Sequence, residues 1–115
     1  MHQFPVDIRF RGMTPSRAVE AAVERWADRL ARAYERIVHC VVVIEEPHRS
    51  QRHGQGFHVR VELAIPSGTI AVSRDPGRDP AHENVYVALN DAFRAARRQL
   101  RDRAQIRRGE VKLHP

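Results

Sequence analysis

Arginine side chains recur along residues 84–108 at a spacing that suits contact with a polyanion. Successive residues of an α-helix are rotated by about 100°. At that rotation one sector, itself about 100° wide, holds Arg94, Arg97, Arg98, Arg101 and Arg108. The segment contains seven arginines and two aspartates, and both aspartates fall outside the sector. Guanidinium groups bind phosphate through paired hydrogen bonds. The spacing therefore favours a polyanion-binding face over the ordinary alternative, a solvated helix surface.

A second basic stripe lies on the helix predicted for residues 15–36. Within an arc of about 60° at the helical turn angle lie Arg25, Arg29, Arg32 and Arg36. A separate sector of the polar side holds Glu20, Glu24, Asp28 and Glu35. A helix that needs only solubility usually interleaves the two signs, so that opposite charges pair three or four residues apart. The separation favours a second phosphate-binding stripe over a chance pattern.

The other residue types that carry chemistry form no recognisable site. Cys40 is the only cysteine and the histidines are scattered, so zinc ligands do not converge. Cys40 is expected to pack in the core as a small hydrophobic residue. The serines lie in no nucleophile-elbow context, and no glycine-rich phosphate loop is present. We therefore expect no catalytic residue, no metal and no cofactor.

The composition is that of a small basic protein. The chain has 115 residues, a net charge of +6 and 42% hydrophobic residues, which suits one globular domain with a modest core. No apolar run approaches the roughly 20 residues of a membrane span, and the N-terminus lacks the regions of a signal peptide. A single cysteine fits a reducing compartment. These features predict a cytoplasmic protein without a membrane partner.

The elements that carry the two stripes follow from hydrophobic periodicity. Alternating or β-branched runs predict strands, and three-four spacing predicts helices. Thr14 is predicted as the N-cap of the first helix, with Pro15 at its first position. Polar segments at 46–56 and 75–80 are predicted as loops. The strands are expected at 4–11, 38–45, 57–65 and 69–74, and the helices at 15–36 and 84–108.

The order β-α-β-β-β-α predicts an α+β fold. The first strand, the first helix and the second strand should form a right-handed parallel crossover. Each helix must bury an apolar stripe, and one face of a four-stranded sheet can hold both. We expect a two-layer sandwich with two roughly parallel helices on one sheet face, and Trp26 buried against the sheet. Strand order decides whether the arginine stripes face each other or face apart, and the sequence does not give it.

The order of elements and the second helix resemble the ribosome hibernation promoting factor family, also known as the ribosome-associated translation inhibitors. The resemblance spans residues 4 to 108. Its most specific matches are Tyr86, Ala88 and the run Arg98-Gln99-Leu100. Asn84 and Asn90 stand where this family usually carries acids. An asparagine still caps a helix, so these departures have little effect on the fold. They affect only contacts that would need a carboxylate at Asn90.

This resemblance implies binding to ribosomal RNA of the small ribosomal subunit, in the channel where mRNA and tRNA sit. It implies a translation inhibitor that keeps idle ribosomes inactive and uses the basic residues of both helices. Residues 1–108 would form the ribosome-binding domain and 109–115 a tail or linker stub. Long members of the family add a domain that pairs two ribosomes, so the chain resembles the short form or a truncated one. We expect a monomer away from the ribosome.

Two other functions remain open at this point. A generic double-stranded RNA-binding module also places helices on one face of a small sheet. A hydrolase acting on a phosphorylated substrate would need a paired acid and base or an activated nucleophile, and the sequence shows neither. The duplex-binding module is therefore the stronger alternative.

Overall fold

Six elements follow one another in the predicted order β-α-β-β-β-α. The computed structural model describes residues 2–46, 56–74 and 84–113, with the side chains of the last helix up to residue 104. The predicted loops at 46–56 and 75–80 fall largely outside these residues. The elements are β1 (Val6–Arg11), α1 (Arg17–Ala33), β2 (His39–Glu45), β3 (His58–Ile65), β4 (Gly68–Arg74) and α2 (Val85–Leu113).

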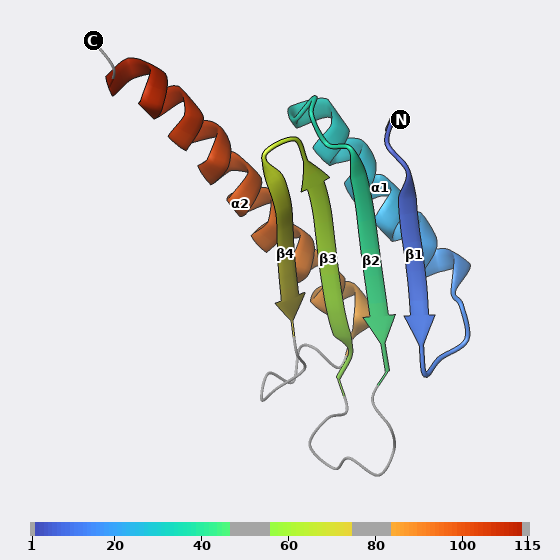
Figure 1. Cartoon of the computed structure of the whole chain (residues 1–115). Helices are drawn as coiled ribbons and strands as arrows, with labels where there is room; N and C mark the ends of the chain where they lie inside the picture. Colours follow the sequence, from blue (N-terminus) through green and yellow to red (C-terminus); the bar gives the residue numbers. More distant parts are fainter. Residues whose placement is uncertain (1, 47–55, 75–83, 114–115) are drawn as a thin grey trace.

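The four strands form one sheet in the order β1-β2-β3-β4. β1 and β2 are parallel, and the other neighbouring strands are antiparallel. Both helices cover the same face of this sheet and run in roughly the same direction (Figure 1). α1 contacts β1, α2 contacts β3 and β4, and the two helices contact each other. The predicted two-layer α+β sandwich is confirmed.

Alternation along the strands places a continuous apolar layer beneath the helices. Cys40 lies opposite Leu63, and Val42 lies opposite Val61. Leu63 also lies opposite Ile70 on the other side, and all five side chains have no exposed surface. A shift of one residue would turn each of them toward solvent. The burial of this layer therefore fixes the register, and it confirms that Cys40 packs in the core.

The first helix begins later than the sequence predicts. Ser16, not Thr14, is the N-cap, because its backbone is extended and its Oγ accepts a hydrogen bond from the Val19 N–H at 3.2 Å. Pro15 therefore precedes the helix instead of opening it. Both Thr14 and Ser16 suit a cap by type, but Ser16 stands three residues before Val19, the first buried residue of the helix.

The ends of the helices also differ from their predicted positions. α1 ends at Ala33 rather than at residue 36, and the N–H of the extended residue Tyr34 bonds to the Leu30 carbonyl at 2.8 Å. α2 continues past residue 108 to Leu113, and its ribbon projects beyond the edge of the sheet (Figure 1). A single glycine such as Gly109 costs a helix about 1 kcal/mol and does not force it to stop.

Trp26 joins the two helices. Its side chain is 4% exposed, and its ring stacks on Phe93 of α2 with centroids 5.3 Å apart and planes inclined by 6°. The indole Nε1–H donates a hydrogen bond to Asn90 Oδ1 at 2.8 Å, which supplies the partner that a buried indole needs. The sequence predicts burial of this ring against the sheet. The burial is confirmed, and the stacking partner is α2.

Replacing Trp26 by Ala should lower the free energy of unfolding by about 3–5 kcal/mol, the usual effect of losing a large core aromatic. Urea denaturation at neutral pH measures it. Trp26→Phe is the matched control, since it keeps an aromatic ring beside Phe93 and removes the hydrogen bond to Asn90. The control should lose less stability than the alanine variant. Wild-type stability in Trp26→Ala would contradict this packing of the helices.

Cys40 should be unreactive in the native protein. Burial raises the pKa of its thiol to about 12, and the thiolate is the form that reacts. At pH 8 an aromatic disulfide reagent should therefore label the native chain only as fast as the chain opens. One thiol per chain should react at once in denaturant. Rapid labelling of the native protein would contradict the burial of Cys40.

Candidate nucleic-acid interface

The arginines of both predicted stripes are exposed wherever the structure describes their side chains. On α1 these are Arg25, Arg29 and Arg32, and on α2 they are Arg94, Arg97, Arg98 and Arg101. Their exposure follows from position, because each stripe lies beside the apolar stripe that its helix buries. Arg36 is also exposed, but it lies beyond the end of α1 at Ala33 and is therefore not part of a helical stripe as predicted. Arg108 belongs to the predicted stripe of α2, but its side chain lies outside the described residues.

The two stripes meet where the helices touch. The Cζ atom of Arg29 lies 5.0 Å from the centroid of the Trp26 ring, and that of Arg97 lies 5.4 Å from it. Both distances are within the range of about 6 Å for a cation–π contact. One arginine from each helix therefore lies against the same buried ring. The stripes face each other, and we call the surface between them the interhelical groove.

A hollow of about 290 Å³ opens in this groove near the start of α2. Three of its lining residues are cationic and none is acidic. The complete lining is Ala22, Arg25, Trp26, Arg29, Tyr86, Asn90 and Arg94. We call it the arginine hollow. It brings predicted site residues from both helices together around one concave surface.

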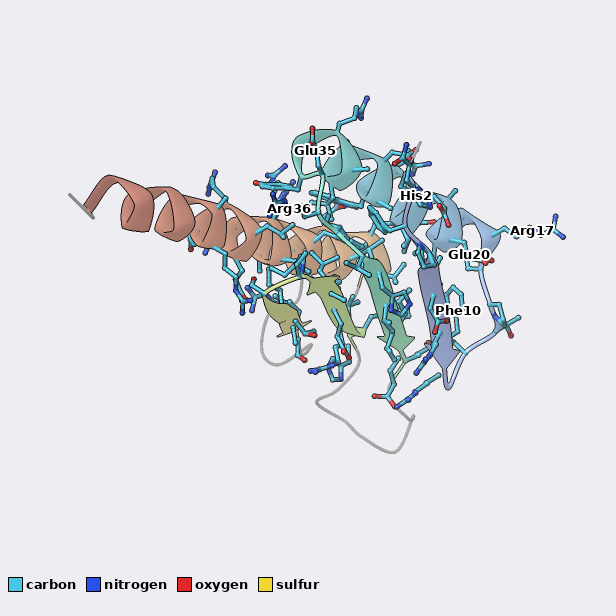
Figure 2. All side chains as sticks on the ribbon, turned by 45° about the horizontal axis from the view of Figure 1, so that its top comes forward. His2, Phe10, Arg17, Glu20, Glu35 and Arg36 are labelled. Carbon is cyan, nitrogen blue, oxygen red and sulfur yellow. The ribbon has the colours of Figure 1, made fainter. Side chains whose placement is uncertain are left out.

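A second hollow, of about 450 Å³, lies at the end of α1 and is lined by Arg36, Glu35 and Arg103 among others. Figure 2 shows Arg36 and Glu35 together at this end of the helix. Arg103 lies outside the predicted stripe. It belongs here because the β3–β4 turn approaches it, so that a Cβ added at Gly68 would lie 3.4 Å from Arg103 Nη1. The pattern of α2 alone gives no signal for this contact.

Other predicted residues flank the groove. Arg32 lines a hollow shared with Gln3 and Phe4 of the N-terminal segment. Arg98 and Arg101 are exposed. At the helical turn angle, Arg98 lies further round α2 from Asn90, the partner of Trp26, whereas Arg101 lies on the same side as Arg97 but about one turn further along the helix. The structure therefore gathers only part of the predicted set into the groove, namely Arg25, Arg29, Arg94 and Arg97.

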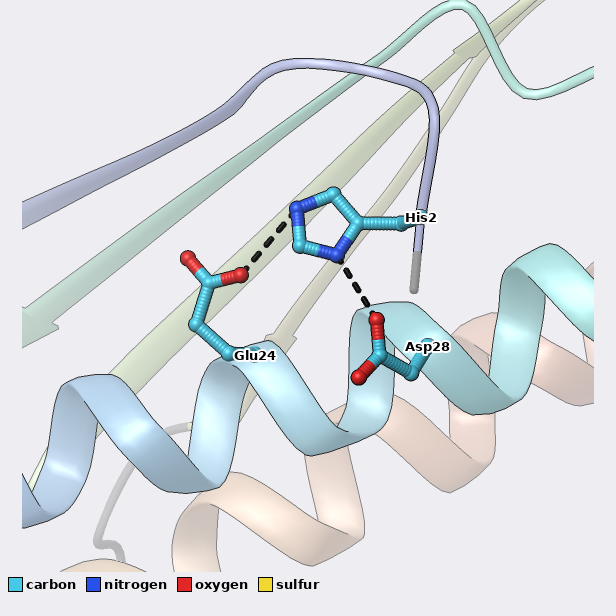
Figure 3. Close-up of polar contacts among 3 residues, drawn as sticks. All are labelled: His2, Glu24 and Asp28. Atoms are coloured by element: carbon cyan, nitrogen blue, oxygen red, sulfur yellow. Dashed lines mark hydrogen bonds and ion pairs between the residues drawn. The ribbon is translucent and has the colours of Figure 1, made fainter.

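Acidic side chains of α1 are engaged away from the arginine stripe. His2 Nε2 lies 3.0 Å from Glu24 Oε2, and His2 Nδ1 lies 2.9 Å from Asp28 Oδ1 (Figure 3). The hydrogen bond with His2 holds the pKa of Asp28 below its usual value. At the helical turn angle the sector of Glu24 and Asp28 is separate from that of the arginines. These carboxylates therefore leave the groove cationic.

Within α2, one charge pair and one neutral side chain border the arginine hollow. Asp91 Oδ1 lies 3.8 Å from Arg94 Nη1, and an exposed pair of this kind contributes at most about 1 kcal/mol. Asn90 accepts the Trp26 N–H through its amide oxygen. This contact needs an acceptor and no charge, so the absence of a carboxylate at Asn90 leaves it intact. It also keeps negative charge out of the hollow.

The groove suits phosphate binding by its chemistry. Guanidinium groups donate several hydrogen bonds in a fixed plane and keep their charge at all physiological pH values.

Among the described residues, no group of three or more His, Cys, Asp or Glu side chains is placed to hold a metal ion. In the same part of the chain, no helix is long and apolar enough to cross a membrane.

Solved structures share this fold at low sequence identity. A ribosomal subunit interface protein from Coxiella burnetii superposes with a TM-score of 0.72 at 13% identity, over 89% of this chain and 99% of that one. The N-terminal domain of Protein Y from Thermus thermophilus gives a TM-score of 0.62 at 19% identity, over 86% and 94% of the two chains. No curated protein sequence matches the chain.

A family model described as Sigma 54 modulation protein / S30EA ribosomal protein matches residues 6–108. The match covers nearly the whole chain, including all four strands, α1 and most of α2. It confirms the resemblance drawn from Tyr86, Ala88 and the run Arg98-Gln99-Leu100. The chain therefore belongs to the Sigma 54 modulation protein / S30EA ribosomal protein family, a family of ribosome-associated proteins.

Proposed function

We propose that this chain is a cytoplasmic translation inhibitor that binds ribosomal RNA of the small ribosomal subunit and keeps idle ribosomes inactive. The site of binding is the channel that mRNA and tRNA occupy during translation. Residues 1–108 form the ribosome-binding domain, and the RNA-contacting residues are those of the two arginine stripes.

The observation that carries this proposal is the meeting of the stripes across the interhelical groove. One stripe alone offers a line of few phosphate contacts. The two facing stripes meet at Trp26, where Arg29 and Arg97 both contact its ring. An RNA backbone that lies in the interhelical groove can therefore contact arginines of both helices. Membership in a family of ribosome-associated proteins supports the ribosome as the source of that RNA.

The mechanism is competitive occlusion. The protein fills space that mRNA and tRNA need and carries out no chemistry, which agrees with a groove of guanidinium groups. Occlusion requires that the protein be held in one orientation. Contacts from two helices on a rigid sheet meet this requirement better than contacts from one flexible segment, because their relative positions are fixed by the core.

Ribosome binding should weaken as salt concentration rises. The arginine stripes displace counterions when they meet phosphates, and added salt opposes that release. The measurement is the dissociation constant for purified small subunits at two or more salt concentrations and constant magnesium. An affinity that does not change with salt would contradict a phosphate-binding groove.

Charge reversal of the α2 stripe should abolish ribosome binding. Changing Arg97, Arg98 and Arg101 to Glu replaces attraction by repulsion at the same phosphates. The fold should persist, because all three side chains are exposed. Ribosome co-sedimentation and inhibition of translation are measured at fixed salt, and circular dichroism checks the fold. Reversal of Arg25, Arg29 and Arg32 on α1 should have the same effect.

A matched control reverses three arginines on the opposite face of the sheet, Arg9, Arg11 and Arg60. It changes the net charge by the same amount and should bind ribosomes far better than either helix variant. Reversal of Arg49 and Arg52, in the predicted loop at 46–56, should also matter less. A folded α2 variant that still co-sedimented with ribosomes and inhibited translation would contradict the proposal. Equal loss in the sheet control would point to net charge alone.

Competition with duplex RNA separates ribosome binding from the duplex-binding alternative. Small subunits should displace duplex RNA from the protein at lower concentration than duplex displaces subunits. The reverse order would favour a generic double-stranded RNA-binding module.

A further inference from the structure

Tyr86 is an aromatic side chain that remains exposed inside the arginine hollow. It is 40% exposed and, with Val38, is one of two large hydrophobic side chains exposed in the described part of the chain. It lies in the first turn of α2, where its backbone N–H donates to Asn84 Oδ1 at 2.8 Å. This hydrogen bond fixes the backbone that carries the ring, and Tyr86 is one of the residues that line the hollow.

The cationic lining of the hollow surrounds this ring on both helices. Arg25 and Arg29 come from α1 and Arg94 comes from α2, and all three side chains are exposed. The first turn of α2 contains no acidic residue, so the positive end of the helix dipole is not offset there. An aromatic face beside several guanidinium groups is the arrangement that proteins use for unpaired nucleotides, with stacking for the base and charge for the backbone.

The floor of the hollow is closed to a ligand base. Trp26 is 4% exposed, stacks on Phe93 and lies beneath Arg29 and Arg97. Its N–H is occupied by Asn90. Of the two aromatic residues that line the hollow, only Tyr86 therefore retains an accessible ring. The volume of about 290 Å³ is near the lower end of small-molecule pockets, about 300 Å³, and suits a single nucleotide.

We propose that the arginine hollow is a nucleotide subsite, in which an unpaired RNA base stacks on Tyr86 while Arg25, Arg29 and Arg94 hold the adjacent phosphates. This deepens the proposed function and rests on it for the source of the RNA. Double-stranded RNA keeps its bases paired and stacked within the helix, whereas loops, bulges and ends present bases that can be splayed onto an aromatic ring. The subsite therefore selects unpaired over duplex RNA.

The first experiment compares Tyr86→Ala with Tyr86→Phe for binding to purified small ribosomal subunits. Alanine should weaken binding by about 5- to 150-fold, which corresponds to the 1–3 kcal/mol of base–aromatic stacking. Phenylalanine keeps the ring and should bind nearly as the wild type does. Val38→Ala is the matched control, because it truncates the other exposed hydrophobic side chain, and it should leave binding unchanged. Thermal melting should be close to wild type in all three variants.

The salt dependence distinguishes stacking from charge. Tyr86→Ala should lower affinity at every salt concentration without changing the slope of log affinity against log salt, because it removes no charge. Arg25→Gln should reduce the steepness of that slope, since one phosphate contact is lost. An unchanged affinity in Tyr86→Ala, or a Tyr86→Phe variant as weak as alanine, would overturn the subsite.

The second experiment uses a short single-stranded RNA oligonucleotide and a duplex of the same sequence as probes. Tyr86→Ala should weaken binding of the single strand and leave that of the duplex unchanged. Equal weakening of both would overturn the subsite. Failure of the wild type to bind small subunits would instead overturn the proposed function, and the oligonucleotides then decide the subsite alone. A wild type that binds neither subunits nor single strand would overturn both.

Discussion

The contact between Trp26 and α2 sets the geometry on which the interface depends. The helices belong to one sheet face, but the sheet alone does not fix how their arginine stripes meet. The stack on Phe93 and the hydrogen bond to Asn90 Oδ1 tie α1 to a defined turn of α2. Since side chains three and four residues apart lie on one side of a helix, this single registration also brings Arg25 and Arg29 opposite Arg94 and its neighbours.

Bringing like charges together has a cost that this arrangement keeps small. Two unit charges 4 Å apart repel by about 1 kcal/mol in water, and salt screens exposed charges further. A cation–π contact at an exposed site contributes about 0.5–1 kcal/mol, and Arg29 and Arg97 each make one with Trp26. The two effects are of similar size, so the groove can stay cationic without a carboxylate between the helices. A polyanion bound in the groove would relieve the remaining repulsion.

Much of the fold could be predicted because it depends on local periodicity. The alternation of Val59, Val61 and Leu63 determines which side of β3 is buried. The spacing of Val19, Val23 and Leu30 determines in the same way which side of α1 is buried. The exposure of the arginines follows from the same spacing. Helix ends were predicted less well, because Thr14 and Ser16 both suit an N-cap by type and only the tertiary packing selects between them.

The parallel packing of the helices on one sheet face could be predicted, but the way their arginine stripes meet could not. That meeting depends on strand order and on contacts between residues far apart in sequence. The apolar spacing of the first helix predicts that Trp26 is a core residue. The sequence around Trp26 does not identify Phe93 and Asn90 as its partners. Arg103 was missed for the same reason, since it reaches the second hollow through the position of the β3–β4 turn. Periodicity assigns a side chain to a face, and the fold decides what that face meets.

Asn90 shows how a position can be constrained by geometry while its charge is free to vary. The buried indole N–H of Trp26 requires an acceptor at this point, and an amide oxygen serves as well as a carboxylate oxygen. The choice between them acts on the groove instead, because a carboxylate would place a negative charge among Arg25, Arg29 and Arg94. An amide supplies the acceptor that the core needs and adds no negative charge to the lining of the arginine hollow. The charge at Asn90 could therefore change without loss of the packing contact to Trp26, although this side chain takes part in both the core and the groove.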